Sequence, residues 1–284
     1  ILGYPPEDLV LKPAAVEACH AAIESFAKEP GIAALIGTPW RDHGKLYNAV
    51  VLIADGEIKA TRYKHDLPNY AVFDEKRVFA PGHIPAPVDW RGLRLGLPIC
   101  EDIWLEDVPR ALATQGADFF ISINGSPWRR TIESERRDAF LKWADLDVPL
   151  VFVNQVGGQD ELVFDGASFA WNPGGGEIQR LPAFTEHLAY SDWTKADGVW
   201  TGTSEQKSKV LTGLEADWKA TCLALADYVN KNGFPGVVLG MSGGIDSAIS
   251  AALAADALGP DRVWAVMMPS KYTSDHSLED AKAC

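Results

Sequence analysis

The sequence has few cysteines, no excess of basic residues and no long apolar run. Four cysteines in 284 residues do not indicate a disulfide scaffold, so we expect a reducing, cytoplasmic location. The net charge of −13 argues against nucleic acid as the main partner, although local loops can still hold nucleotides. No apolar stretch approaches the length of a membrane span, and the first residues do not resemble a signal peptide. We therefore expect small-molecule substrates, and neither nucleic acid nor membrane as a partner.

The composition is that of an ordinary globular protein, with 47% hydrophobic and 23% charged residues. A chain of 284 residues is long enough for about two domains. It starts at Ile1 rather than at a methionine, and it stops at Cys284 soon after a glycine-rich stretch. We expect from this that the chain is truncated at both ends.

That glycine-rich stretch is the strongest local signal in the sequence. The apolar run Val237–Leu239 predicts a buried parallel strand. Strong helix formers occupy 248–258 and end at Gly259-Pro260. A strand, a glycine turn and a helix N-terminus form an anion site, because free N–H groups and the helix dipole point at the ligand. No GxxxxGK[ST] motif occurs, so the expected phosphate site is not a Walker loop.

The string Ser-Gly-Gly-Ile-Asp-Ser resembles the pyrophosphate-binding loop of ATP pyrophosphatases, which split ATP into AMP and pyrophosphate. Asp246 is the natural oxygen ligand for Mg²⁺, which would neutralise the departing pyrophosphate. Its alternative role is a capping or first-turn carboxylate of the helix. The alternative for the whole loop is a tight turn with glycines for steric reasons. The resemblance implies that ATP is held by Gly240, Met241, Ser242, Gly243, Gly244, Ile245, Asp246 and Ser247.

The rest of the chain alternates between predicted helices and strands. Pro13–Ala27 has a helical apolar face, and Leu46–Lys64 is predicted as a hairpin through Asp55-Gly56. Val163–Trp171 and Glu177–Arg180 are predicted as a second hairpin. Hairpins mixed with helices and buried strands predict an α/β layered fold with a mixed sheet. Further predicted elements are helical segments at 107–114 and 133–146 and strands at 93–99, 119–123 and 150–153.

A change in composition predicts the domain boundary. Residues from about 196 to 212 lack apolar periodicity and are rich in Gly, Ser, Thr and Lys, which is typical of a linker. A helix is predicted next, over Leu214–Asn232. We therefore expect one domain over 1–195 and the beginning of a second over 213–284.

Cys100 is placed at the C-terminal end of a predicted buried strand. Strand ends in open α/β sheets are where ligands and nucleophiles lie. A thiol there can attack a substrate if a cation lowers its pKa and a base takes its proton. From its position alone, a buried structural cysteine is the more common case.

Three segments, 63–77, 97–104 and 124–127, together resemble the nitrilase or carbon–nitrogen hydrolase family. That family uses a Cys-Glu-Lys triad on an α-β-β-α sandwich. The resemblance implies that Cys100 is the nucleophile and Lys64 the triad lysine. The cysteine would attack a carboxamide carbon, while lysine and backbone N–H groups stabilise the oxyanion. A carboxylate would carry the proton to the departing ammonia.

The same resemblance implies further site residues. The family's general-base glutamate precedes a stretch found here at 3–9, so it is expected upstream of Ile1. Glu75 matches a second glutamate near the triad, with a plain surface charge as the alternative. Tyr70 is the expected glutamine contact, with a half-buried loop tyrosine as the alternative. Ser126 fits the region that holds the substrate carboxylate.

An amidase joined to an ATP-pyrophosphatase loop resembles the glutamine-dependent NAD synthetases, and the stretches 155–166 and 267–281 agree with that family. The resemblance implies a nitrilase-like sandwich followed by the start of a Rossmann-like parallel-sheet domain. It implies glutamine hydrolysis through a cysteine thioester, and transfer of ammonia to adenylated deamido-NAD. ATP and Mg²⁺ are the implied cofactors, and a homo-oligomer is the implied assembly. The alternatives are a stand-alone amidase with a vestigial nucleotide domain and a non-catalytic scaffold.

Overall fold

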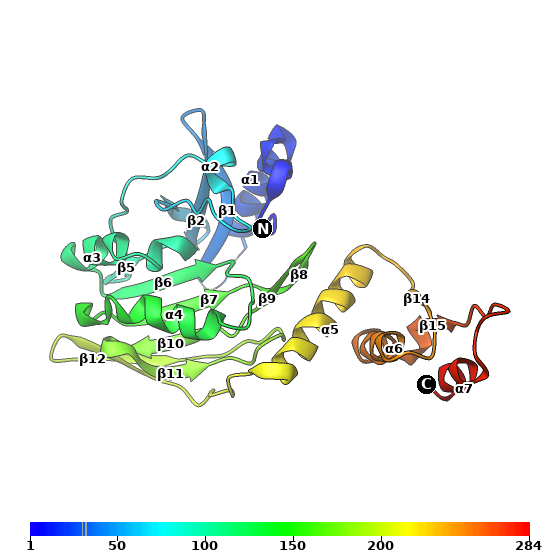
Figure 1. Ribbon diagram of the computed structural model, residues 1–284. Helices are drawn as coiled ribbons and strands as arrows, with labels where there is room; N and C mark the ends of the chain where they lie inside the picture. The colour runs from blue at the N-terminus through cyan, green and yellow to red at the C-terminus, as the bar shows by residue number, and fades with distance from the viewer. Residues whose placement is uncertain (30, 32) are drawn as a thin grey trace.

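Two β-sheets packed face to face, with helices on both outer sides, form the larger part of the computed structural model (Figure 1). The structure describes residues 1–29, 31 and 33–284. Apolar side chains of both sheets meet between them, including Val50 and Leu52 from one sheet and Leu95 and Phe119 from the other. This is the α-β-β-α arrangement that the sequence predicted.

The smaller sheet is an antiparallel meander covered by the first helix. Its hairpin turns at Asp55 and Gly56, both with positive φ (54° and 84°), as the Asp-Gly pair predicted. The helix buries Ile23 and Ala27 against this sheet, where they meet Val51. The elements are α1 (Pro13–Ala27), β1 (Ala34–Asp42), β2 (Lys45–Ala54) and β3 (Glu57–Tyr63).

The larger sheet has the order β11-β10-β7-β6-β5-β4 and is mixed, as expected. Its central pairs β5–β6 and β6–β7 are parallel, and the outer pairs are antiparallel. Helices α3 (Asp107–Thr114) and α4 (Ile132–Leu141) cover its outer face over a core that includes Phe120 and Phe140. The strands are β4 (Val88–Trp90), β5 (Leu93–Gly96), β6 (Phe119–Asn124), β7 (Leu150–Asn154), β10 (Phe169–Asn172) and β11 (Gly176–Arg180).

The prediction of one strand over Val163–Trp171 was wrong. The segment divides into β9 (Leu162–Asp165), which pairs with β8 (Val156–Gln159), and β10 in the larger sheet. The chain bends between them at Gly166 and Ala167, whose φ angles are 63° and 46°. Two consecutive residues in the left-handed region cannot continue an extended strand.

Part of the segment predicted as a linker is folded. Within 196–212, Val199–Thr203 forms β13, which pairs with β12 (Asp192–Ala196). Trp193 and Trp200 of this hairpin pack on Phe119 of the larger sheet. Aromatic anchors therefore hold a segment whose Gly, Ser and Thr content indicated a linker, while the domain boundary itself stays a prediction.

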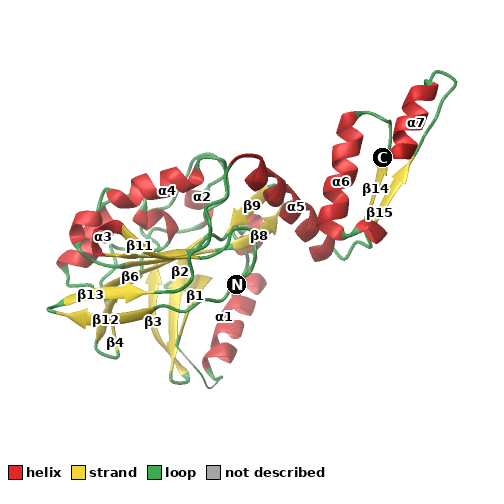
Figure 2. Cartoon of the chain, turned by 90° about the horizontal axis from the view of Figure 1, so that it is seen from below, coloured by secondary structure: helices red, strands yellow, loops and turns green. Residues whose placement is uncertain are grey.

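The second part of the chain lies apart from the sheets, with helix α5 (Gly213–Lys231) between the two (Figures 1 and 2). In this second part, β14 (Val237–Gly240) pairs in parallel with β15 (Val263–Val266), which confirms the strand predicted before the glycine loop. The sequence predicted that this strand is buried, but Val238 is 71% exposed. Helices α6 (Ile245–Leu258) and α7 (Asp275–Ala283) complete this part.

The remaining helical segments are short. Helix α2 (Glu75–Val78) lies in the loop after β3, and the single-turn 3₁₀ helices are Glu7–Leu11, Cys100–Ile103, Ala144–Leu146, Pro173–Gly175 and Pro260–Arg262. Over the described residues, no helix is both long enough and apolar enough to cross a bilayer.

Candidate active site

Lys64 and Glu75 form a buried ion pair at the end of β3. The Lys64 Nζ lies 2.7 Å from Glu75 Oε2, and the two residues are 0% and 3% exposed. The second carboxylate oxygen of Glu75 accepts a hydrogen bond from Asn48 Nδ2 at 2.8 Å. Burial alone would lower the pKa of Lys64, but its electrostatic interactions with Cys100 and Glu75 leave that pKa raised. The lysine is therefore a fixed cation at neutral pH.

Cys100 follows β5 at the start of a 3₁₀ turn and has a strained backbone. Its φ is 46°, in the left-handed region that residues other than glycine rarely adopt and that recurs at functional sites. Burial raises the pKa of its thiol to about 11, although the Lys64 charge and the Gly125 N–H act to lower it. The resting thiol is protonated, so an attack by sulfur needs a base.

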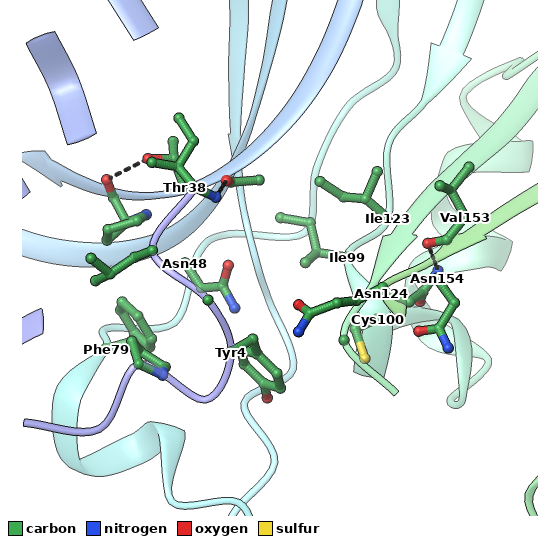
Figure 3. Close-up of a pocket in the computed structure, with 18 residues that line it drawn as sticks. Tyr4, Thr38, Asn48, Phe79, Ile99, Cys100, Ile123, Asn124, Val153 and Asn154 are labelled. Atoms are coloured by element: carbon green, nitrogen blue, oxygen red, sulfur yellow. Dashed lines mark hydrogen bonds between the residues drawn. The ribbon is translucent and has the colours of Figure 1, made fainter. Parts of the chain in front are cut away.

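A cavity of about 290 Å³ opens beside Cys100. Figure 3 shows its two sides, contributed by different parts of the chain. Tyr4, Thr38, Asn48 and Phe79 lie on one side, and Cys100, Ile123, Val153 and Asn154 lie on the other. An apolar wall with a few polar groups is typical of a small-ligand site.

Tyr4 connects the cavity to the ion pair. The Lys64 Nζ lies 5.6 Å from the centre of the Tyr4 ring. A Cβ at Gly125 would come within 2.6 Å of Tyr4 Cδ1, so glycine is required for this ring to pack there. Burial and then the charge of Glu75 raise the pKa of Tyr4. The ring thus packs on the segment whose N–H faces the Cys100 thiol.

A second cavity, of about 690 Å³, is lined by Tyr70 and Glu101 and shares Phe79 with the first. The Tyr70 hydroxyl donates to Glu101 Oε2 at 2.9 Å, and Tyr70 is 54% exposed. Burial raises the pKa of Glu101, opposed by this hydrogen bond and by Lys64. The residue after Cys100 is thus an acidic group that lines this cavity.

Asp102 ties the lysine loop to the cysteine strand. Its carboxylate accepts hydrogen bonds from the N–H groups of His65, Asp66 and Ile99, at 3.1, 2.8 and 2.9 Å. Burial raises the pKa of Asp102 to about 6 and outweighs these hydrogen bonds. One carboxylate therefore fixes both Lys64's neighbour and Cys100's neighbour.

Ser126 is held in a separate buried network. Arg136 donates to the Ser126 carbonyl oxygen at 2.9 Å and to its Oγ at 3.1 Å, and Arg136 pairs with Asp165 at 2.8 Å. The Ser126 N–H donates to Asn154 Oδ1, which brings the network to the wall of the Cys100 cavity. The side chain of Ser126 thus has protein partners already, and its substrate role stays a prediction.

The glycine loop 240–247 is exposed and held by its own hydroxyl groups. Gly244 N–H donates to Ser242 Oγ at 3.2 Å, and Ser247 Oγ donates to Gly244 O at 2.8 Å. Gly243 has a φ of 80°, and a Cβ there would meet Ser277 O at 2.4 Å. Asp246 lies exposed in the first turn of α6. Over the described residues, no group of three or more His, Cys, Asp or Glu side chains could hold a metal by itself.

Residues 1–197 match the family described as "Carbon-nitrogen hydrolase". The chain belongs to the carbon–nitrogen hydrolase family. Residues 217–284 match a second family, described as "NAD synthase". The hydrolase part contains the Cys100 cavity, and the NAD synthase part contains the glycine loop.

Curated relatives contain both parts in the same order. The chain is 43% identical to a glutamine-dependent NAD(+) synthetase of Rhodobacter capsulatus, over 99% of this chain and 51% of that protein. It is 38% identical to the protein of that name in Acinetobacter baylyi, over 99% of this chain and 52% of that one. The chain spans about half the length of the curated relatives it matches: the hydrolase domain and the beginning of the NAD synthase domain.

Solved structures agree with this carbon–nitrogen hydrolase assignment. A glutamine-dependent NAD+ synthetase from Acinetobacter baumannii, in complex with ADP, has a TM-score of 0.91 at 38% identity and covers 99% of this chain and 53% of that one. An amidase from Nesterenkonia sp. AN1 has a TM-score of 0.55 at 26% identity, covering 63% and 69%. Its structure shows covalent addition of the acetamide moiety of fluoroacetamide at the active-site cysteine.

In this hydrolase domain the structure brings Cys100, Lys64 and Glu75 into one centre, and places Tyr70 at the neighbouring cavity. Sequence reasoning did not select three residues of the site. Asn48 faces Lys64 across the β2–β3 hairpin, and its carbonyl accepts the Lys64 N–H at 2.8 Å, so strand register was the available signal. Glu101 adjoins Cys100, and Tyr4 lies in the recognised 3–9 stretch, yet neither has a local pattern of its own.

Proposed function

We propose that the protein carrying this chain hydrolyses glutamine at Cys100 and uses the ammonia to convert deamido-NAD to NAD with ATP. One observation supports this most. A strained, buried cysteine shares a centre with a fixed lysine cation, in a chain whose next domain begins with a phosphate-type glycine loop. Homo-oligomeric assembly and a cytoplasmic location are proposed on the resemblance alone.

In the first stage, Cys100 Sγ attacks the carboxamide carbon of glutamine and forms a thioester. Lys64 and the Gly125 N–H, both of which act on the thiol's pKa, would stabilise the tetrahedral oxyanion. Ammonia leaves with the proton taken from the thiol, and water then releases glutamate. The amidase from Nesterenkonia, with its cysteine adduct, supports a cysteine in this role.

The thiol needs a base, and we assign this role to the carboxylate expected upstream of Ile1. Ile1 lines the same cavity as Cys100, so residues that precede it would emerge near the thiol. Glu75 already uses both oxygens, on Lys64 and Asn48, and so keeps the lysine charged. Tyr70, which lines the neighbouring cavity, and Ser126, which is bonded to Asn154 in the wall of the Cys100 cavity, are proposed as glutamine contacts.

In the second stage, the nicotinate carboxylate of deamido-NAD attacks the α-phosphorus of ATP, and ammonia later displaces AMP. Residues 240–247 would hold the phosphates through N–H groups at the start of α6. A single exposed carboxylate, Asp246, suits Mg²⁺, which keeps waters and phosphate oxygens as its other ligands. Mg²⁺ bound there would neutralise phosphate charge. The ADP complex of the Acinetobacter baumannii relative supports a nucleotide in this domain.

A coupled assay of the intact protein tests this proposal. NAD formation from deamido-NAD and ATP is measured with glutamine and with ammonium as nitrogen source. Cys100→Ala is expected to lose glutamine-driven synthesis by at least about 10³-fold and to keep ammonium-driven synthesis. Asp246→Asn is expected to keep glutamine hydrolysis and to lose NAD synthesis from either source.

Two outcomes separate the alternatives. A stand-alone amidase would release ammonia from glutamine without exchanging pyrophosphate into ATP. A scaffold would do neither. Glutamine-driven activity that survives in Cys100→Ala would show that the nucleophile is assigned wrongly.

A further inference from the structure

Two side chains of α5 hold one peptide unit on each side of Gly158 in β8. Asp227 Oδ2 accepts the Gly158 N–H at 2.6 Å, and Lys231 Nζ donates to the Gly158 carbonyl at 2.6 Å. The two side chains also pair with each other at 2.9 Å. A Cβ at Gly158 would lie 3.1 Å from Ala224 Cα, so glycine permits this close approach of helix and strand. The helix of the second part thus fixes the backbone of a strand in the hydrolase part.

The next residue of β8, Gln159, holds the loop before the first helix. Its Nε2 donates to the Pro5 carbonyl at 2.8 Å, and its Oε1 accepts the Tyr4 N–H at 3.3 Å. A Cβ at Gly3 would lie 2.4 Å from Gln159 Oε1, and Gly3 has a φ of 87°. One amide therefore clamps the backbone on both sides of Tyr4.

Tyr4 in turn lines the Cys100 cavity, packs on Gly125 and lies over the Lys64 ammonium. The contacts run without a gap from α5 through Gly158 and Gln159 to Tyr4. Each step is a hydrogen bond or a close packing contact between groups that are at least partly buried, apart from Lys231, which is 58% exposed.

We propose that Gln159, and Asp227 with Lys231 acting through Gly158, are positioning residues for the glutamine site. They fix the position of Tyr4. Because Tyr4 packs on Gly125, they also fix the segment whose N–H faces the thiol. The assignment rests on the proposed hydrolysis at Cys100. It also means that the helix leading into the nucleotide domain contributes to the geometry of the amide site.

The test compares Gln159→Met and Asp227→Asn in the intact protein. Gln159→Met keeps the length of the side chain and removes both hydrogen bonds. We expect kcat/KM for glutamine hydrolysis to fall between about tenfold and about 10²-fold in each variant, mainly through kcat, because reacting groups are displaced rather than removed. Ammonium-driven NAD synthesis should stay within about twofold of the wild type, since the second centre is untouched.

Asp217→Asn is the matched control. Asp217 lies on the same helix and binds Arg130 of the hydrolase part at 2.7 and 3.0 Å, but its contact does not lead to the Tyr4 loop. If α5 only docks the two parts, Asp217→Asn and Asp227→Asn will reduce glutamine hydrolysis equally. If the contacts from α5 to Tyr4 position the site, only Asp227→Asn will reduce glutamine hydrolysis. The double variant Gln159→Met, Asp227→Asn will then lose less of this activity than the product of the two single losses.

Failure of this inference differs from failure of the proposed function. A wild-type protein that releases no ammonia from glutamine overturns the function. A wild type that does so, with Gln159→Met unchanged in kcat and KM and in the rate at which iodoacetamide alkylates Cys100, overturns the positioning role alone. The melting temperature of each variant is recorded, and a variant whose kcat falls only with its folded fraction also counts against the role.

Discussion

The two candidate centres of this chain are built in opposite ways. The Cys100 centre uses charged and polar side chains that are almost fully buried, with Lys64 at 0% and Glu75 at 3% exposure. The glycine loop uses backbone N–H groups on an exposed turn, with Asp246 open to solvent. The first centre depends on the packing around it, and the second depends on local backbone conformation.

This difference fits the ligands proposed for the two centres. An amide carbonyl is neutral, so a nearby cation attracts it strongly only when negative charge develops on its oxygen. A low-dielectric surrounding increases that attraction. A triphosphate already carries several charges, and a helix N-terminus binds such an anion without any buried charge. We therefore expect the first centre to be sensitive to charge changes and the second to backbone changes.

Removing the charge of Lys64 should give the largest effect on stability. Lys64→Met leaves the Glu75 carboxylate buried without its cation, and breaking a buried pair in this way costs about 3–5 kcal/mol. Urea unfolding of the hydrolase domain, followed by tryptophan fluorescence, measures the loss. Asp246→Asn, on the exposed loop, is expected to unfold at the same urea concentration as the wild type.

The double variant Lys64→Met, Glu75→Met shows whether the unpaired charge is the cause. It should be more stable than Lys64→Met alone, because no buried charge is left without a partner. If the double variant is the less stable of the two, packing around the pair rather than its charge governs the stability of this centre.

At pH 8, Cys100 in the folded protein is expected to react with alkylating agents about 10²-fold more slowly than an ordinary thiol. Burial raises its thiol pKa from 9.0 to about 11, so the thiolate population at pH 8 is about a hundredth of that of an ordinary thiol. Alkylation by iodoacetamide, located by peptide mass spectrometry, should therefore still be accelerating at pH 10 in the folded protein. In urea the rate should reach half of its maximum near pH 9, the ordinary thiol pKa, and level off above about pH 10.

Cys222, which is only partly buried, controls for reagent access and should be labelled before Cys100 at every pH. If labelling of folded Cys100 already levels off below pH 9, the Lys64 cation outweighs burial. The first centre would then hold an activated thiolate at rest.

Much of the fold could be predicted because its signals are local. The Asp55-Gly56 turn, most of the buried face of α1 and the parallel strand at Val237 follow from neighbouring residues, and the structure confirms them, although Phe26 of α1 is 49% exposed. The break at Gly166-Ala167 and the β12–β13 hairpin could not be predicted. The hairpin is held where Trp193 and Trp200 contact Phe119, a residue far away in the sequence. The break follows from the pairing of β9 with β8 and of β10 with β7.

The candidate site divides along the same line. Cys100, Lys64 and the glycine loop lie in recognisable strings, and they could be proposed from the sequence. Asn48 and Glu101 hold Glu75 and Tyr70 through contacts between separate segments. The exposure of Val238, which the apolar run predicted to be buried, likewise depends on what packs on β14 rather than on the strand itself.

Gly243→Ala should give the smallest effect, confined to the second centre. Its φ of 80° is strained for alanine, and the new Cβ would meet Ser277 O at 2.4 Å. Moving the loop away from α7 should weaken ATP binding about tenfold, which corresponds to about 1.4 kcal/mol. Calorimetric titration with ATP measures this loss, and glutamine hydrolysis at Cys100 should not change.

Gly259→Ala separates strain from loop geometry. Gly259 ends the same helix with a φ of 84°, but no atom lies within 4 Å of its added Cβ. Alanine there is also forced to a positive φ, but without the clash and away from the loop, so ATP affinity should stay within about twofold. Equal losses in both variants would mean that ATP binding follows the stability of α6 as a whole. The second centre would then depend on packing as the first does, and the contrast between buried side chains and an exposed backbone turn would no longer hold.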